Sequence, residues 1–161
     1  MADGRTHDQL TKKVSIMLPI FVGGWYWWFY DTRFLLMAFL VWLGCQLQRV
    51  MSPDLDVDTG FYGFGILRRN LGYVVGISWE IFWKPYALLV AHRSWISHSI
   101  LIGSLVRLGY LYFFYWLVTR IYPLAFIVPD VNNFKYFFIF FLGFFIADCG
   151  HLWLDDFKIW R

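Results

Sequence analysis

Long apolar runs separated by short polar segments dominate this chain. The first covers residues 14–30 without a charge, and after a polar turn the second covers residues 34–47. A third covers residues 99–118 with one charge, Arg107, and a fourth covers residues 134–153. About 17–25 apolar residues cross a bilayer as a helix, and a somewhat shorter run crosses with the help of its polar flanks. The pattern predicts four transmembrane helices, of which the first two form a hairpin.

A further aromatic-rich run, residues 73–91, has a different pattern. Glu80 and Lys84 lie near its middle, and Pro85 follows directly. Each charge at the centre of a bilayer costs about 2.5–3.5 kcal/mol on insertion scales. Glu80 and Lys84 can pair on one helix face at a spacing of four. We therefore expect a helix that lies in the membrane interface or packs on the cytoplasmic side of the bundle.

The composition agrees with an integral membrane protein. The hydrophobic share is 60%, the charged share is 16%, and 24% of the residues are aromatic, whereas soluble domains are about 45–50% apolar and about 25% charged. A net charge of +3 is too small to indicate a nucleic-acid partner, so membrane lipids are the expected surroundings. The two cysteines lie in apolar runs, which makes a disulfide framework improbable. We expect one all-α domain over residues 1–161, a polytopic helical bundle.

The distribution of basic residues predicts the orientation. With four spans, ten of the 14 lysines and arginines fall on the side of the termini and three on the other, with Arg107 inside a span. Basic residues are enriched in cytoplasmic loops. Both termini are therefore predicted to be cytoplasmic. A fifth span at residues 73–91 would divide the ten and weaken the bias.

All four histidines lie at or near the cytoplasmic ends of the predicted spans, together with acidic residues. This set comprises His7, Asp8, Asp54, Asp56, Asp58, His92, His98, Asp148, His151 and Asp155. Imidazole with carboxylate suits zinc, manganese or iron better than calcium, whose sites are built from oxygen. A solvated turn or an interfacial histidine explains any one of these residues, but their joint placement favours a metal site. No polar path continues across the bilayer, so a transporter ranks last.

Local spacing supports this hypothesis on the fourth span. Asp148, His151 and Asp155 stand at i, i+3 and i+7, so their side chains point to one side of a helix. An unpaired carboxylate such as Asp148 at the end of an aromatic helix is costly, which indicates a functional role. His92 and His98 do not share a helix face, and we expect them on a loop leading into the third span. Ser97 is a candidate cap for that helix.

Four ordered motifs carry a resemblance to a known family: Gly-Arg-Thr-His-Asp at 4–8, Pro-Asp-Leu-Asp at 53–56, His-Arg-Ser-x-x-Ser-His at 92–98 and Asp-x-x-His-x-x-x-Asp at 148–155. They resemble an uncharacterised membrane-associated metal-binding family common in cyanobacteria, which places the chain in a bacterial inner (or thylakoid) membrane. That family is similar to predicted membrane-bound metal-dependent hydrolases. These look distantly related to zinc-dependent phospholipase C and the P1-type nucleases, which cleave phosphoesters with clustered zinc ions.

The resemblance implies a divalent metal cofactor, with zinc ahead of manganese and iron. The phospholipase pattern needs more histidines than this chain has, so one or two ions are expected. The implied ligands are His7, Asp54, Asp56, His92, His98, Asp148 and His151.

Two functions remain open on these grounds. The first is a metal-dependent hydrolase at the cytoplasmic membrane face, where the ion lowers the pKa of a bound water and Asp56 or Asp155 is the general base. A phosphoester or a lipid headgroup is then the expected substrate. The second is a non-catalytic membrane protein with a structural or sensory metal. The substrate and the oligomeric state are not predicted.

Overall fold

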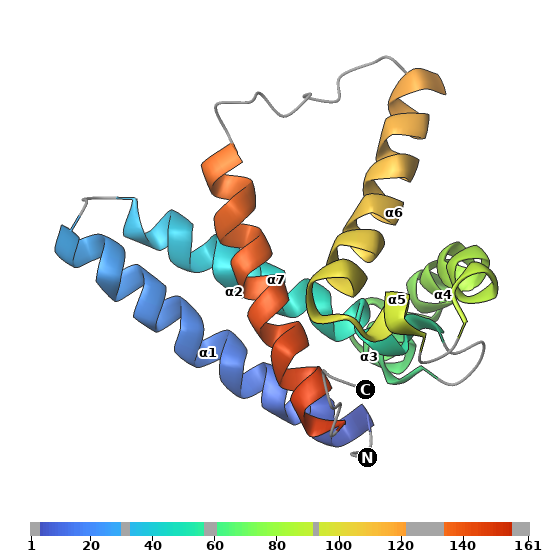
Figure 1. Ribbon diagram of the computed structural model, residues 1–161, viewed down its shortest axis with the longest axis horizontal. Coiled ribbons are helices and arrows are strands. Elements are labelled where there is room, and N and C mark those ends of the chain that lie inside the picture. The colour runs from blue at the N-terminus through green and yellow to red at the C-terminus, as the bar shows by residue number, and fades with distance from the viewer. Residues whose placement is uncertain (1–3, 30–32, 57–60, 92–93, 122–133, 156–161) are drawn as a thin grey trace.

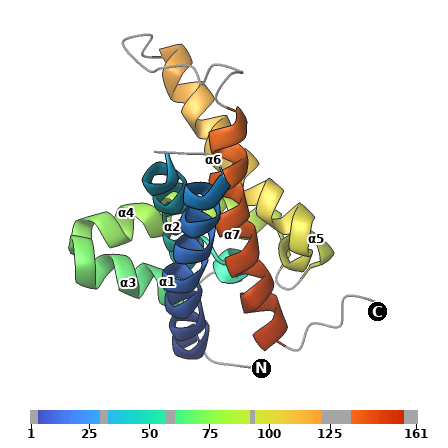
Figure 2. The ribbon, with the colours of Figure 1, turned by 90° about the vertical axis from the view of Figure 1, so that its left-hand side faces the viewer.

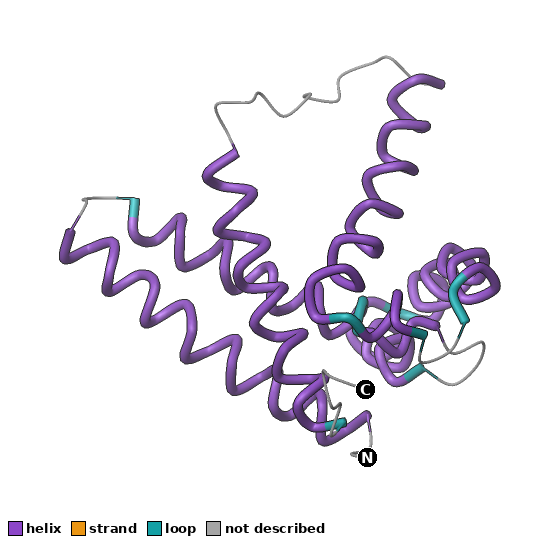
Figure 3. Tube along the Cα trace, viewed as in Figure 1, coloured by secondary structure: helices purple, strands orange, loops and turns teal. Residues whose placement is uncertain are grey.

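The computed structural model describes residues 4–29, 33–56, 61–91, 94–121 and 134–155. In these segments the chain is helical and contains no strand (Figure 3). The all-α fold class is confirmed. The elements are α1 (Gly4–Phe29), α2 (Phe34–Val50), the 3-10 turn η1 (Pro53–Asp56), α3 (Tyr62–Leu71), α4 (Tyr73–Leu89), α5 (Trp95–His98), α6 (Ile100–Ile121) and α7 (Phe134–Leu154).

The expected helices match α2, α6 and α7 closely, but α1 begins at Gly4 instead of near Val14. The polar start of α1 continues the helix because one of its faces is buried. His7, Thr11 and Ser15 stand four residues apart, and each is at most 5% exposed. A spacing of four keeps side chains on one helix face. The helix therefore carries His7 into the body of the molecule.

The expectation of four spanning helices is not met by length and hydropathy. Among the described residues, two segments are long and apolar enough to cross a membrane, Leu101–Ile121 in α6 and Phe134–Leu154 in α7. The apolar helix α2 has only 17 residues. In α1, the polar first turns and the tryptophan- and tyrosine-rich second half lower the hydropathy below that of a typical span. The structure thus supports two spanning candidates, not four.

Helices α1 and α2 form an antiparallel hairpin, and α7 packs against α2 across it (Figure 1). The helices α2 and α7 meet backbone to backbone through two glycines. A Cβ at Gly44 would lie 2.2 Å from the Phe140 carbonyl oxygen, and one at Gly143 would lie 2.2 Å from that of Val41. The Cys45 thiol also donates to the Gly143 carbonyl at 3.3 Å. Small residues permit such close helix packing in membrane proteins.

The α3–α4 hairpin runs across the direction of α1, α2 and α7 (Figure 2). Its inner side joins a core that includes Trp83, Tyr86 and Phe144 from α4 and α7. The Trp79 indole donates to the Val50 carbonyl at 3.0 Å and so attaches α4 to the end of α2. The direction of α4, across the other helices, agrees with the helix that was expected to lie in the membrane interface.

Candidate metal centre

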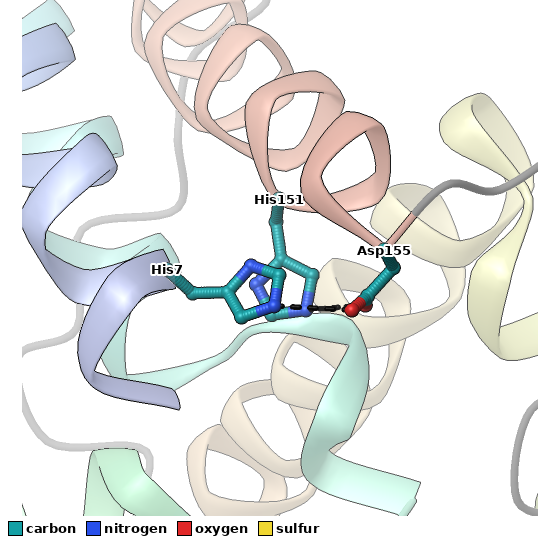
Figure 4. A group of neighbouring side chains, drawn as sticks. All are labelled: His7, His151 and Asp155. Atoms are coloured by element: carbon teal, nitrogen blue, oxygen red, sulfur yellow. Dashed lines mark hydrogen bonds and ion pairs between the residues drawn. The ribbon is translucent and has the colours of Figure 1, made fainter. Parts of the chain in front are cut away.

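Three side chains from the two ends of the described chain meet below α7 (Figure 4). His7 comes from the first turns of α1, His151 from the last turn of α7, and Asp155 from the residue that follows α7. His7 Nε2 lies 3.1 Å from Asp155 Oδ1, and His151 Nε2 lies 3.4 Å from Asp155 Oδ2. The two imidazole rings stack with centroids 3.8 Å apart. The potential ligand atoms of these three residues lie within 4.8 Å of one another.

A second group of donors shares Asp155 with the first. It consists of Asp54 from η1, His98 from the end of α5, and Asp155, again within 4.8 Å of one another. Asp54 Oδ2 also lies 3.3 Å from His151 Nε2, which joins the two groups. Five donors therefore form one cluster at the end of the bundle where α1, α7, η1 and α5 converge. We call these residues the His–Asp cluster: His7, Asp54, His98, His151 and Asp155.

The spacing inside the His–Asp cluster agrees with that of atoms around one ion. Two ligand atoms about 2.0–2.2 Å from a first-row metal are about 2.8–3.6 Å apart for bond angles of about 90–110°. The measured separations of 3.1, 3.3 and 3.4 Å all fall in this range. The His7–Asp155, Asp54–His151 and His151–Asp155 contacts therefore have the separation expected for two ligands of one ion.

Several buried polar atoms in the cluster have no hydrogen-bond partner among the described residues. They are His7 Nδ1, His151 Nε2 and Asp155 Oδ2. His151 Nε2 lies within ion-pair distance of the Asp54 and Asp155 carboxylates, but neither contact has the geometry of a hydrogen bond. Leaving such atoms unsatisfied costs about 1–3 kcal/mol each. A metal ion would satisfy His151 Nε2 and Asp155 Oδ2 together.

A chain of hydrogen bonds next to the cluster fixes the relative positions of the helices that carry His7 and His151. Thr11, one turn after His7, donates to Gln48 Oε1 at 3.2 Å. Gln48 in turn donates through Nε2 to Asp148 Oδ1 at 3.2 Å. Asp148 is one turn before His151 on α7. The α1, α2 and α7 backbones are thus tied together immediately below the cluster.

Asp148 itself lies outside the His–Asp cluster, although it was predicted as a ligand. Its carboxylate pairs with Arg107, accepts a hydrogen bond from Ser104 and accepts one from Gln48. Arg107 also donates to the Met51 carbonyl at 2.6 Å. Both Arg107 and Asp148 are completely buried. The costly carboxylate of Asp148 is therefore satisfied by an arginine.

His98 is held by the short helix α5. Ser94 caps this helix by accepting from the Ser97 backbone amide at 3.3 Å. Ser97, which was expected to cap the third span, lies inside α5. The Ser97 hydroxyl instead lies 2.8 Å from His98 Nδ1. A Cβ at Gly103 would lie 2.4 Å from the Ser97 carbonyl oxygen. This close approach presses α5 against the start of α6 and fixes the direction of His98.

The surroundings of His7, Asp54 and Asp155 favour the protonation states in which these side chains bind metal, whereas His151 carries a positive charge and must release a proton before it binds an ion. Burial, followed by the positive charge of His151, lowers the pKa of His7 below its ordinary value, which favours the neutral imidazole. Burial alone would raise the pKa of Asp54 and of Asp155, but their interactions with His151 and His7 outweigh burial and lower both. Neutral imidazole and ionised carboxylate are the forms that bind metal.

A small cavity adjoins the cluster. It has a volume of about 20 Å³ and is lined by His7, His151 and Asp54 together with Asp8, Arg49 and Tyr62, among others. About 10–15 Å³ of such volume holds one water molecule. Arg49 Nε donates to Asp8 Oδ1 at 2.6 Å, and Lys12 Nζ lies 2.7 Å from Asp8 Oδ2. A water or small polar group can therefore sit beside the donors.

Two predicted ligands cannot be placed. His92 and the side chain of Asp56 lie outside the described residues. Asp155 was predicted as a general base, whereas the structure places it in both donor groups. Asp155 lies four residues after His151, and this spacing is the sequence feature that indicated a shared role as metal ligand. Nothing in the sequence indicated that Gln48 or Ser104 would join the Asp148 network, because Gln48 follows one apolar run and Ser104 lies within another, both on other helices.

The chain matches a known protein family over nearly its whole length. The family described as "Uncharacterized metal-binding protein (DUF2227)" matches residues 2–160 of the chain. No curated protein and no solved structure matches.

Proposed function

The chain belongs to this family of uncharacterised metal-binding proteins, and we propose that the His–Asp cluster is its metal site. The relation between His151 and Asp155 carries the proposal. His151 Nε2 and Asp155 Oδ2 are 3.4 Å apart, both are buried, and neither has a hydrogen-bond partner among the described residues. A cation in contact with both atoms would explain why two buried polar atoms lie this close together without a hydrogen bond.

Zinc is the metal that we propose, with manganese and iron as the alternatives that the same donors accept. Three imidazoles and two carboxylates exceed the four ligands of a single tetrahedral zinc. The two donor groups meet at Asp155, and a carboxylate can bind a different ion with each oxygen. The cluster therefore has room for one ion with an expanded shell or for two ions bridged by Asp155.

The cluster is proposed to lie at the cytoplasmic surface of a bacterial inner or thylakoid membrane. The candidate spans α6 and α7 run from the end of the molecule that holds the cluster toward the opposite end (Figure 1). Large apolar side chains are exposed along α1 and α7, among them Ile20, Trp28 and Phe138. Exposed large apolar side chains in this number fit lipid better than water.

Within this placement we propose a metal-dependent hydrolase that acts on a phosphoester or a lipid headgroup. The support is the small cavity beside His7, His151 and Asp54, which offers a water molecule a place next to the ion. A bound ion would lower the pKa of that water and polarise the scissile group. Asp155 would hold the ion. Asp56 is then the remaining candidate for the general base.

A structural or sensory metal is the second candidate function. It is favoured by the burial of all three described histidines of the cluster and by a donor set large enough to close the coordination shell. A closed shell holds helices together but leaves no position for a reacting water. In that case the ion would tie α1 to α7 and to the η1 and α5 segments.

Metal analysis of the purified protein tests the site. Wild type is expected to retain a stoichiometric divalent metal, and His151→Ala and Asp155→Asn are expected to lose it. Glu80→Gln is a matched control, because it also removes a carboxylate charge but lies on α4, paired with Arg68. Little metal in wild type, or equal metal in all four proteins, would rule out the cluster as the site.

A separate assay tests catalysis. Reconstituted protein is incubated with phosphodiester, phosphomonoester and phospholipid substrates, with and without chelator. Chelator-sensitive hydrolysis that returns when zinc is added, and that is absent in His98→Ala, supports the hydrolase. A metal-loaded wild type that hydrolyses none of these compounds supports the structural or sensory function instead.

A further inference from the structure

A second and larger cavity lies on α3, separate from the donors of the His–Asp cluster. Its volume is about 510 Å³, within the range of about 300–1,000 Å³ that is typical of ligand sites. The wall contains three aromatic residues, Phe61, Tyr62 and Phe64, and three charged ones, Arg68, Arg69 and Glu80. We call this cavity the α3 groove. Its lining combines an apolar part with a cationic part.

The two arginines of the α3 groove have different partners. Arg68 pairs with Glu80 across the α3–α4 hairpin and is thereby neutralised. Arg69 is exposed, and among the described residues no carboxylate pairs with it. Its guanidinium lies 5.5 Å from the centroid of the Tyr62 ring and donates to the Tyr62 hydroxyl at 3.4 Å. Arg69 thus contacts a neutral partner, and no carboxylate of the described residues compensates its positive charge.

The tip of the α3–α4 hairpin points to a membrane as the source of that anion. Leu71, Tyr73 and Val74 at the turn are 63%, 67% and 76% exposed. Gly72 makes this turn possible, because its φ of 97° is a conformation that other residues rarely adopt. Apolar and aromatic residues next to arginine are characteristic of segments that lie in the interface and contact anionic lipids.

The α3 groove also adjoins the cavity beside the metal donors. Phe61 and Tyr62 line both the groove and the small cavity that includes His7 and His151. These two aromatic side chains therefore lie between the groove and the cavity beside the cluster. A molecule in the groove would approach the proposed metal from this side.

We propose that the α3 groove binds the phosphate of an anionic phospholipid, with Arg69 on the phosphate and the aromatic residues against the glycerol and upper acyl chains. The hydrogen bonds from a guanidinium to phosphate are charge-assisted and therefore strong. The proposal deepens the proposed function, since it names the lipid class presented to the metal, but lipid binding in the groove does not require an ion.

Lipid retention measures this binding. The protein is prepared in neutral maltoside micelles that contain an increasing fraction of phosphatidylglycerol or phosphatidylcholine, and bound lipid is counted by native mass spectrometry. Wild type is expected to prefer phosphatidylglycerol, and Arg69→Gln is expected to lose about 10-fold in apparent affinity for it, as expected for the loss of hydrogen bonds from a charged donor. Tyr62→Phe keeps the ring and should give a smaller loss.

Lys84→Gln is the matched control, because Lys84 is exposed on the same hairpin but does not line the groove. Equal losses in Lys84→Gln and Arg69→Gln, or none in either variant, would overturn the proposal. Displacement of the lipid by inorganic phosphate at similar concentration would overturn it in favour of a soluble anion. Metal content is measured on the same samples. Arg69→Gln should retain metal and His151→Ala should retain lipid, so failure of the groove and failure of the metal site give different results.

Discussion

His7 and Asp155 are 148 positions apart in the chain, yet His7 Nε2 and Asp155 Oδ1 lie 3.1 Å from each other. Each residue belongs to an element that is anchored independently. His7 is on α1, which Thr11 attaches to α2, and Asp155 follows α7, which Gly143 packs against α2. Helix α2 is therefore the common support that brings the two ends of the His–Asp cluster together.

Because Asp155 is shared by both donor groups, its loss should weaken metal binding more than the loss of any other donor. Asp155→Asn is expected to reduce zinc affinity by more than the roughly 10–100-fold typical of outer-sphere partners. His98→Ala should have a smaller effect, because it belongs to one group only. Competition titration with a fluorescent zinc chelator measures both. A larger loss in His98→Ala would contradict the shared role of Asp155.

Removal of the metal should destabilise the bundle. A ligand that binds only the folded state at about 100 times its dissociation constant contributes about 2.7 kcal/mol. For a chain of this length, that corresponds to a melting temperature roughly 5–10 °C lower after chelation. Differential scanning fluorimetry in detergent, with chelator and then with excess zinc, measures the change. The His151→Ala variant should show no response to chelator.

Substitution of Arg107 should destabilise the protein strongly through Asp148. Arg107→Met leaves the carboxylate of Asp148 buried without its charge partner, which costs about 3–5 kcal/mol. The double variant Arg107→Met/Asp148→Leu removes both charges and should be more stable than the single variant. Chemical denaturation in mixed micelles gives the comparison. A double variant less stable than Arg107→Met alone would show that Asp148 stabilises the fold mainly through Ser104 and Gln48 and not through compensation of its charge.

The glycine contacts between α2 and α7 can be tested with matched helical glycines. Gly143→Ala places a Cβ 2.2 Å from the Val41 carbonyl oxygen, so the helices must separate. Gly109→Ala on α6 meets no atom within 4 Å and should stabilise by up to about 1 kcal/mol through helix propensity. Gly143→Ala should instead lower stability by about 1–3 kcal/mol, the range for overpacking. Thermal unfolding of the two variants should shift in opposite directions.

The Asp8 network predicts a dependence of stability on pH. Burial alone would raise the pKa of Asp8, but the hydrogen bonds and charges of Arg49 and Lys12 outweigh it and lower the pKa below its ordinary value. A lowered folded-state pKa contributes stability above the unfolded pKa near 3.8, and this contribution disappears as the pH falls through the folded value. Asp8→Asn should therefore be less stable than wild type at neutral pH and should approach it in acid.

Unfolding of chelated wild type and chelated Asp8→Asn across this pH range provides the measurement, since chelation removes the separate effect of proton competition at the metal donors. A difference between the two proteins that stays constant down to strongly acidic pH would contradict the assigned charge network.

The apolar runs predicted α2, α6 and α7 well because charges and prolines mark their ends. The beginning of α1 was missed because its buried face is polar, and polar residues at a spacing of four give no hydropathy signal. The number of spanning helices was wrong for a related reason. The tryptophan and tyrosine side chains of α1 expose apolar area, as side chains of a membrane segment do. They do not, however, raise the hydropathy of α1 to that of a spanning helix.

The cluster was partly predictable, since the chain has few histidines and their acidic neighbours were visible in the sequence. The side chains that each carboxylate contacts could not be predicted. Asp148 and Asp155 both share a face with His151 by spacing, but only the tertiary structure places Arg107 beside Asp148 and leaves Asp155 to the histidines. Such choices depend on contacts between α6 and α7, and no local pattern encodes them.

The order in which the donors are synthesised adds a consequence for biogenesis. His7 is translated first, and His151 and Asp155 follow after every other described helix. A nascent chain therefore carries His7, Asp54 and His98 before His151 and Asp155 are made, and the full set of proposed donors assembles only when α7 has packed on α2. Capture of the proposed ion would then coincide with the last step of assembly, so that the metal would stabilise finished molecules and leave incomplete ones open to degradation.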